Sequence, residues 1–144
     1  IPVGQSDDGL TWVKVIAGES LGVSAVIDTV QPVHYLHFKM EPGAEHEQCV
    51  PANFNGLVYC FTGALWAGTK RTILKNGSVG ILSDGEALCL GVDESAEENA
   101  EFLLLAGEPT NAPIARWGPF VMNTQEEIMQ AVEDYQNGTL VQQP

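Results

Sequence analysis

The sequence predicts an all-β domain, a sandwich or barrel, with one helix near its C-terminus. Short apolar runs recur about every ten residues between Gly, Pro and Asn, which is the pattern of a β-sandwich or barrel. One amphipathic helix pattern follows at residues 124–136. Of the 144 residues, 44% are hydrophobic and 17% are charged, as in ordinary globular proteins. We expect residues 1–144 to form a single domain, with residues 139–144 as a frayed tail.

The expected strands are short runs of apolar and β-branched residues bounded by turn residues. They lie at residues 10–17, 23–30, 33–40, 57–62, 64–67, 71–74, 78–82, 87–92, 102–106 and 114–117. The sequence Lys75-Asn76-Gly77-Ser78 predicts a tight hairpin turn, because Asn-Gly adopts the backbone angles that such a turn requires.

The helix is marked at both ends. Thr124 and Glu127 form a capping-box pattern, and Gly138 suits the left-handed C-terminal cap. The apolar stripe consists of Ile128, Ala131, Val132 and Tyr135. We expect this stripe to pack on the outside of the β core.

Composition excludes several partners. A formal net charge of −13 with only six Lys and Arg argues against direct binding of nucleic acid, which depends on basic side chains. No apolar run reaches the roughly 18 residues that a membrane helix needs, so we expect no membrane partner. The three cysteines form no CxxC pair, which favours a reducing, intracellular location.

The chain has three histidines, so metal sites can be considered one by one. His34 and His37 lie three residues apart in an expected strand and therefore point to opposite faces, His34 with the core residues. His46 shares a face with Gln48 only if its segment is extended, and Cys49 follows. Because a metal centre usually needs three ligands of His, Cys, Asp or Glu type, we expect no metal ligand in this chain.

Several strings resemble the pirin family of the cupin superfamily. The most specific is AGEPTNAPIARWGPFVMNTQEEIMQAVEDYQNG at residues 106–138, and VKVIAGESLGVSA and LHFKMEPGAEHEQCVP resemble the start of the family's second domain. The resemblance covers residues 12–138 and corresponds to the C-terminal barrel alone. It implies a cupin-type (jelly-roll) β-barrel or sandwich with the helix packed outside.

The resemblance also carries functional expectations. Pirins resemble two-barrel proteins whose Fe(II) is held by the N-terminal barrel, which has no counterpart in this chain, so no cofactor and no catalytic residue are expected here. The family's activities include quercetin 2,3-dioxygenase chemistry and iron-linked transcriptional co-regulation, which implies a cytoplasmic or nuclear location. Departures include Ala112, where the family usually has an acid, and a short tail in place of a basic segment.

Metal-binding cupins carry an HxH pair and a Glu before a strand-end Gly, and a further His in a second motif. If Gly63 is that strand-end Gly, the Glu position falls near Gly56. The HxH pair then falls either near Cys49 and Pro51 or near His46 and Gln48. The further His of the second motif falls near Leu88 or Cys89. At most one His remains of the four expected ligands.

Two functional hypotheses follow. The first is a non-catalytic cupin domain that packs against a metal-binding N-terminal pirin-type barrel, or against a second copy of itself as a homodimer, and that presents a surface to protein partners. Its candidate interface residues are Trp117, Pro119 and Phe120. The alternative is a free-standing enzyme or small-ligand binder that uses the barrel interior. Its candidate pocket residues are His46, Gln48, Cys49 and Tyr59.

Overall fold

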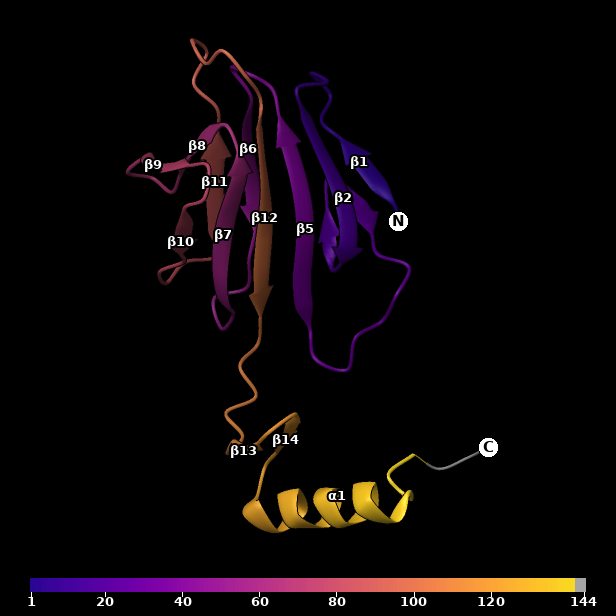
Figure 1. Ribbon diagram of the computed structural model, residues 1–144. Helices are drawn as coiled ribbons and strands as arrows, with labels where there is room; N and C mark the ends of the chain where they lie inside the picture. The colour runs from indigo at the N-terminus through magenta and orange to yellow at the C-terminus, as the bar shows by residue number, and fades with distance from the viewer. Residues whose placement is uncertain (142–144) are drawn as a thin grey trace. The chain divides into compact units, whose positions relative to one another are not determined.

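The computed structural model describes residues 1–141 and is dominated by strands (Figure 1). The elements are β1 Val3–Gln5, β2 Thr11–Ala17, β3 Glu19–Ser20, β4 Val23–Ser24, β5 Val33–Met40, β6 Glu45–Cys49, β7 Asn55–Thr62, β8 Ala64–Ala67, β9 Thr72–Lys75, β10 Val79–Ile81, β11 Ala87–Gly91, β12 Ala100–Gly107, β13 Ala115–Trp117, β14 Phe120–Met122 and α1 Gln125–Asn137. The all-β expectation with one C-terminal helix is confirmed.

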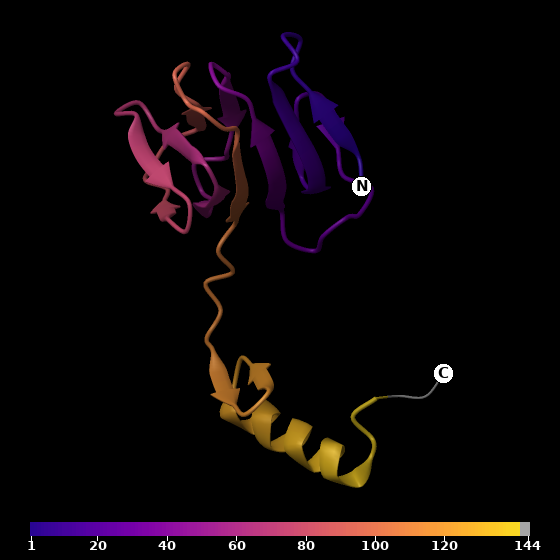
Figure 2. The same cartoon turned by 45° about the horizontal axis from the view of Figure 1, so that its top comes forward.

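Two antiparallel sheets make up the main unit, residues 1–109. The larger sheet has the order β1-β2-β5-β12-β7-β10, and the smaller sheet has the order β6-β11-β8-β9. Figures 1 and 2 show the two sheets as the layers of a sandwich. Every second side chain of the long strands is buried, as the burial alternation of β12 shows, so the core lies between the sheets.

The core of this unit is aliphatic with one stacked aromatic pair. Phe38 of β5 and Phe102 of β12 lie directly opposite each other in the ladder, with ring centroids 5.1 Å apart. Leu36, Leu104 and Val58 extend the same inner face and are fully buried. As expected, His34 shares this inner face and His37 points to the outer one.

A second compact unit begins at Thr110 and holds β13, β14 and α1. The helix packs on the β13–β14 hairpin through Ile128 and Ala131, which are buried. Thr124 accepts a hydrogen bond from the Glu127 amide, and Gly138 adopts the left-handed cap, as the sequence predicts. The expectations of a single domain and of a helix packed on the β core stay predictions, and residues 142–144 of the expected tail lie outside the described residues.

One strand prediction is wrong, and four strands were not predicted. Residues 23–30 form a strand only at Val23–Ser24, and the apolar side chains of Val26, Ile27 and Val30 are exposed. The strands that were not predicted are β1, β3, β6 and β14. The turn at Lys75–Ser78 is present, with Ser78 N donating to Lys75 O at 2.9 Å, but it joins strands of different sheets: β9 pairs with β8, and β10 pairs with β7.

Candidate functional site in the barrel interior

Strand β6 carries the side chains that occupy the expected metal position. Its alternation turns His46 and Gln48 toward the interior and Glu45, Glu47 and Cys49 outward. β11 pairs with it so that Leu90 lies opposite His46 and Leu88 lies opposite Gln48. The two polar residues of β6 therefore face the core beside two leucines.

Gln48 is buried, and its amide is fully engaged. Its Oε1 accepts a hydrogen bond from Ser20 Oγ at 2.6 Å, and its Nε2 donates to the carbonyl oxygens of Glu19, at 3.2 Å, and Cys49, at 3.0 Å. Ser20 is also buried. These bonds join β6 to β3, so the Gln48 side chain serves a structural role.

His46 lies next to Gln48, with its Nε2 3.4 Å from Gln48 Oε1. Its ring packs against Phe38 at a centroid distance of 5.5 Å. Burial lowers the pKa of His46 from its ordinary value, and the hydrogen bond to Gln48 and the charge of Glu47 act in the opposite direction. The interior therefore favours a neutral imidazole at this position.

The residues at the expected ligand positions do not fit an iron centre. Leu88, the inward-facing candidate for the second-motif His, is aliphatic, while Cys89 faces outward with its Sγ 3.8 Å from Glu47 Oε2. A Cβ at Gly56, where the Glu is expected, would lie 2.8 Å from Leu82 Cδ1 and 2.9 Å from Ala106 Cβ. One imidazole and one occupied amide are too few donors for a metal. Within residues 1–141, no group of three His, Cys, Asp or Glu side chains could hold an ion.

The four candidate pocket residues do not all come together. His46 and Gln48 are neighbours in the interior, but Cys49 is exposed on the outer face of β6. Tyr59 lies on the outer face of β7, where its ring is 6.2 Å from that of Phe61. The alternation around the apolar residues Val58 and Cys60 is the sequence signal that predicts this outward orientation.

The candidate interface residues lie in the hairpin of the second unit. Phe120 packs toward Tyr135 of α1, with ring centroids 6.2 Å apart, so it helps to anchor the helix. Trp117 is 57% exposed. Pro119 lies exposed in the turn between β13 and β14. A role of these residues in binding a partner stays a prediction.

The outer face of the larger sheet is a further candidate surface, which the strand patterns alone do not reveal. Apolar and aromatic side chains from five adjacent strands point outward there: Trp12, Tyr35, Leu57, Tyr59, Phe61, Val79, Ile81, Leu103 and Leu105. We call this set the apolar sheet face. Leu103 lies opposite Tyr59, and Leu105 lies between Tyr35 and Leu57, so the residues adjoin one another across the central strands.

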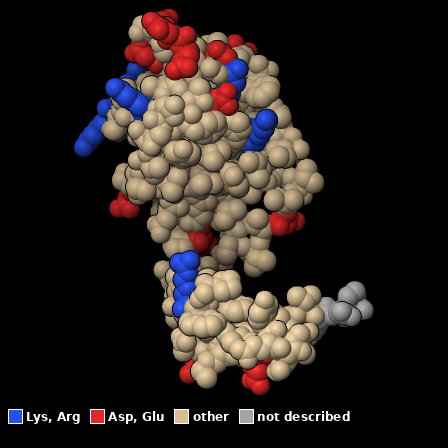
Figure 3. All heavy atoms as spheres, viewed as in Figure 1, with Lys and Arg blue, Asp and Glu red and all other residues tan. Residues whose placement is uncertain are grey.

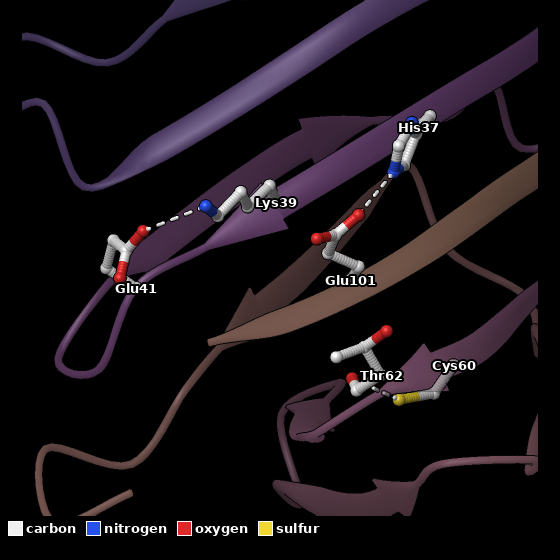
Figure 4. Close-up of polar contacts among 6 residues, drawn as sticks. All are labelled: His37, Lys39, Glu41, Cys60, Thr62 and Glu101. Atoms are coloured by element: carbon white, nitrogen blue, oxygen red, sulfur yellow. Dashed lines mark hydrogen bonds and ion pairs between the residues drawn. The ribbon is translucent and has the colours of Figure 1, made fainter. Parts of the chain in front are cut away.

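Charges on this face are few, and Figure 4 draws two pairs of them. A further one, Lys14 of β2, lies opposite His37 and forms no ion pair among residues 1–141. His37 Nε2 lies 3.1 Å from Glu101 Oε2, and the His37 ring packs on Phe61 at 5.4 Å. Lys39 Nζ lies 3.6 Å from Glu41 Oε1 at the end of β5. The outer face of the smaller sheet is different, because β6 presents Glu45 and Glu47 to solvent. The two faces of the sandwich thus differ in polarity.

Comparison with known proteins agrees with this geometry. The family model described as the pirin C-terminal cupin domain matches residues 35–141. The chain is 37% identical to human pirin over 134 residues, which is 92% of this chain and 45% of that protein. It is 38% identical to a tomato pirin-like protein over 132 residues, 91% of this chain and 44% of that protein. The chain thus spans less than half the length of these relatives.

Solved structures show the same fold. A quercetin 2,3-dioxygenase from Acinetobacter baumannii superposes with a TM-score of 0.82 at 35% identity, covering 96% of this chain and 47% of that one. A cupin domain from a transcriptional regulator of Enterobacter cloacae superposes with a TM-score of 0.54 at 16% identity over 69% of this chain and 98% of that one, a likeness of fold alone. The cupin-type architecture predicted from the sequence is confirmed.

Proposed function

This chain belongs to the pirin family, as a pirin C-terminal cupin domain, and from that premise we propose that it is a non-catalytic domain that packs its apolar sheet face against a metal-binding N-terminal barrel. The relatives are more than twice as long as the matched region, so each has a second half available to cover that face. The metal and its chemistry, including the dioxygenase activity named for one solved neighbour, then belong to the other barrel.

The apolar sheet face carries this proposal. Solvated antiparallel sheets usually present polar residues on their outer side, whereas the outer side of this sheet is mostly apolar, with charges confined to positions such as His37, Lys39 and Glu101. Tyr35 and Tyr59 are 40% and 37% exposed, and they lie opposite the half-buried leucines Leu105 and Leu103 of β12. Trp12, 41% exposed, lies farther out on β2, opposite Lys39. Contiguous apolar patches rimmed by polar groups mark interaction surfaces, and aromatic residues are enriched at the centres of such surfaces.

The barrel interior supports a non-catalytic role. The positions that carry ligands in metal-binding cupins hold a hydrogen-bonded amide at Gln48 and a leucine at Leu88. His46 alone has a metal-binding side chain there, and it packs on Phe38. These residues close the interior instead of presenting donors to an ion.

Binding to a separate barrel tests the docking role. We would titrate this chain with the N-terminal half of the tomato pirin-like protein in an analytical ultracentrifuge and expect a one-to-one complex. Tyr59→Glu places a charge at the centre of the apolar sheet face and should weaken binding at least about tenfold, as expected for an interface aromatic. Ile73→Glu is the matched control, because Ile73 is also exposed but lies on the smaller sheet.

Equal binding by Tyr59→Glu and Ile73→Glu, or no complex at all, would contradict the docking role. A stable mass of two chains without the added barrel, lost in Tyr59→Glu, would assign the face to a second copy of this chain instead.

Iron content tests the non-catalytic role. After anaerobic incubation with Fe(II) and desalting, we expect elemental mass spectrometry to find far less than one iron per chain. One iron per chain that disappears in His46→Ala would contradict this and favour the alternative of a free-standing enzyme.

Location rests on the sequence alone. No helix within residues 1–141 is long and apolar enough to cross a membrane. We propose an intracellular location from cysteine usage, with Cys49, Cys60 and Cys89 all unpaired. Non-reducing electrophoresis of protein extracted with thiol-blocking reagent tests the reduced state of these thiols in the cell.

A further inference from the structure

A separate hollow opens between the two sheets at the β8–β9 turn. It measures about 290 Å³, and Val58, Leu74 and Leu88 form its floor. These three side chains come from β7, β9 and β11, point inward and are at most 8% exposed. The volume lies at the lower end of the range of about 300–1,000 Å³ that is typical of small-molecule sites.

The rim of the hollow is polar and carries one charge. Thr69, Thr72 and Ser83 supply hydroxyl groups, and Lys70 supplies an ammonium group. Among residues 1–141, no Asp or Glu lines the hollow, although the chain has 19 acidic residues. We call this site, with its three floor residues and four rim residues, the Lys70 pocket.

Basic residues gather at this edge of an otherwise acidic chain. Lys70, Arg71 and Lys75 lie within one short segment, and the chain has only six Lys and Arg. Blue atoms are visible at the upper left of Figure 3, on the side where Figure 1 labels β9. Arg71 is engaged elsewhere: its Nη2 lies 2.8 Å from Glu45 Oε1, and its guanidinium stacks 4.2 Å from the Trp66 ring. Lys70 forms no ion pair among residues 1–141, so its charge is available to a ligand.

We propose that the Lys70 pocket binds a small apolar carboxylate, with one ring or a short branched chain. The apolar part lies on Leu74 and Leu88, above the fully buried Val58, and displaces water from the hydrocarbon surface that the two leucines still expose. The carboxylate lies at the rim, where it accepts hydrogen bonds from Lys70 Nζ and from the hydroxyl groups. A cationic ligand is disfavoured, because the lining offers an ammonium group and no carboxylate.

This binding role does not depend on the docking proposal. The floor of the pocket faces the space between the sheets, whereas the apolar sheet face is the outer surface of the larger sheet. The two sites share only Ile81, which lines the pocket but is not one of its floor or rim residues. The pocket also uses none of the residues at the expected iron position except Leu88, which cannot coordinate a metal.

Methyl NMR of Val and Leu side chains tests the proposal. Sodium benzoate is the ligand, and benzamide, which has the same ring without the negative charge, is the control ligand. We expect benzoate to give saturable shifts centred on the methyl groups of Val58, Leu74 and Leu88. Lys70→Gln should weaken benzoate binding roughly two- to fivefold, the size expected for an exposed ion pair, and should leave benzamide binding unchanged. Lys70 is exposed, so this variant should fold.

Lys75→Gln is the matched control, because it removes the same charge from β9 without touching the pocket. It should leave benzoate binding unchanged. The proposal is overturned if benzoate gives no saturable shifts, if the shifts centre on other methyl groups, or if the two lysine variants weaken benzoate binding equally. The last result would indicate a general charge effect and no contact with Lys70.

Discussion

Gln48 occupies an expected metal-ligand position, but its side chain instead connects two strands through hydrogen bonds. Its side chain is 4% exposed and bonds to Ser20, Glu19 and Cys49. Gln48→Ala should lower the free energy of unfolding by about 2–3 kcal/mol, because it leaves the Ser20 hydroxyl and the Glu19 carbonyl without partners inside the protein. Urea titration measures this loss. Gln5→Ala, which removes one exposed hydrogen bond to Gly9, is the control and should cost much less.

The two inward-facing histidines should make stability depend on pH. Burial lowers the pKa of His34 and of His46, and nearby Glu19 and Gln48 respectively oppose that shift. Above pH about 6.5, the ordinary His value, both imidazoles are neutral in the folded and unfolded chain and do not oppose folding. As the pH falls below that value, the unfolded chain takes up protons first, so stability is lost until the folded pKa values are passed.

Protonation of carboxylates also lowers the free energy of unfolding as the pH falls, at lower pH values. The part of the pH dependence that comes from the histidines must therefore be measured separately. The double variant His34→Gln, His46→Gln should lose less unfolding free energy than the wild type between pH 7.5 and pH 5.5. Urea titrations of both proteins at the two pH values give this difference. An identical loss in both proteins would show that the buried imidazoles contribute nothing to the pH dependence.

Orientation of single side chains was predictable where a strand alternates cleanly. His34 and His37 were placed on opposite faces correctly, because Leu36, Phe38 and Met40 mark the buried side of β5. Tyr59, a candidate pocket residue, points to the outer face instead. Its orientation depends on Val58 and Cys60, which are fully buried on the opposite side of β7.

Strand β6 was missed as an element because its inward positions are polar. A half-buried strand is recognised by apolar residues at every second position, and in β6 those positions are His46 and Gln48. Residues 23–30 gave the opposite error. Their apolar residues predict a strand, but pairing continues only through Val23–Ser24, and propensity alone does not create a partner strand.

The turn between β7 and β8 depends on Gly63. Its φ is +64°, and a Cβ there would overlap the carbonyl oxygen of Asn99. Gly63→Ala therefore combines backbone strain with a clash against backbone and should cost more than about 3 kcal/mol of unfolding free energy. Gly22→Ala is the matched control, because Gly22 has a φ of +71° with nothing within 4 Å of a Cβ.

Gly22→Ala should cost only about 1–2 kcal/mol, the strain of a left-handed alanine. Thermal unfolding of the two variants measures the difference. Equal costs would mean that Asn99 moves aside, and that the strand-end glycine is needed for its backbone angle alone.

At the scale of the whole molecule, acidic residues and exposed apolar residues lie on different surfaces, a separation that the sequence pattern does not predict. Acidic residues gather in the 93–98 loop and on β6, while the apolar sheet face carries few charges. The sequence predicted the net charge but not this separation. Outward residues such as Leu103 and Leu105 adjoin Tyr59 and Tyr35 only through strand pairing over long sequence separations.

A net charge of −13 on a chain of this size should make folding sensitive to salt. Repulsion among like charges opposes the compact state, and it is screened when the Debye length falls from about 30 Å at 0.01 M to about 8 Å at 0.15 M ionic strength. We expect the free energy of unfolding to rise over this range of NaCl. The exposed Arg71–Glu45 pair weakens with salt but contributes at most about 1 kcal/mol, so the rise should prevail.

The acidic loop provides the variants for this measurement. Replacing Glu94, Glu97 and Glu98 with Gln removes three exposed negative charges, so it should raise stability at low salt and flatten the salt dependence. Replacing the same residues with Asp keeps the charge and should preserve the salt dependence. If the Gln and Asp variants respond to NaCl alike, charge repulsion in this loop does not limit stability, and the salt effect must come from acidic residues elsewhere, such as those on β6.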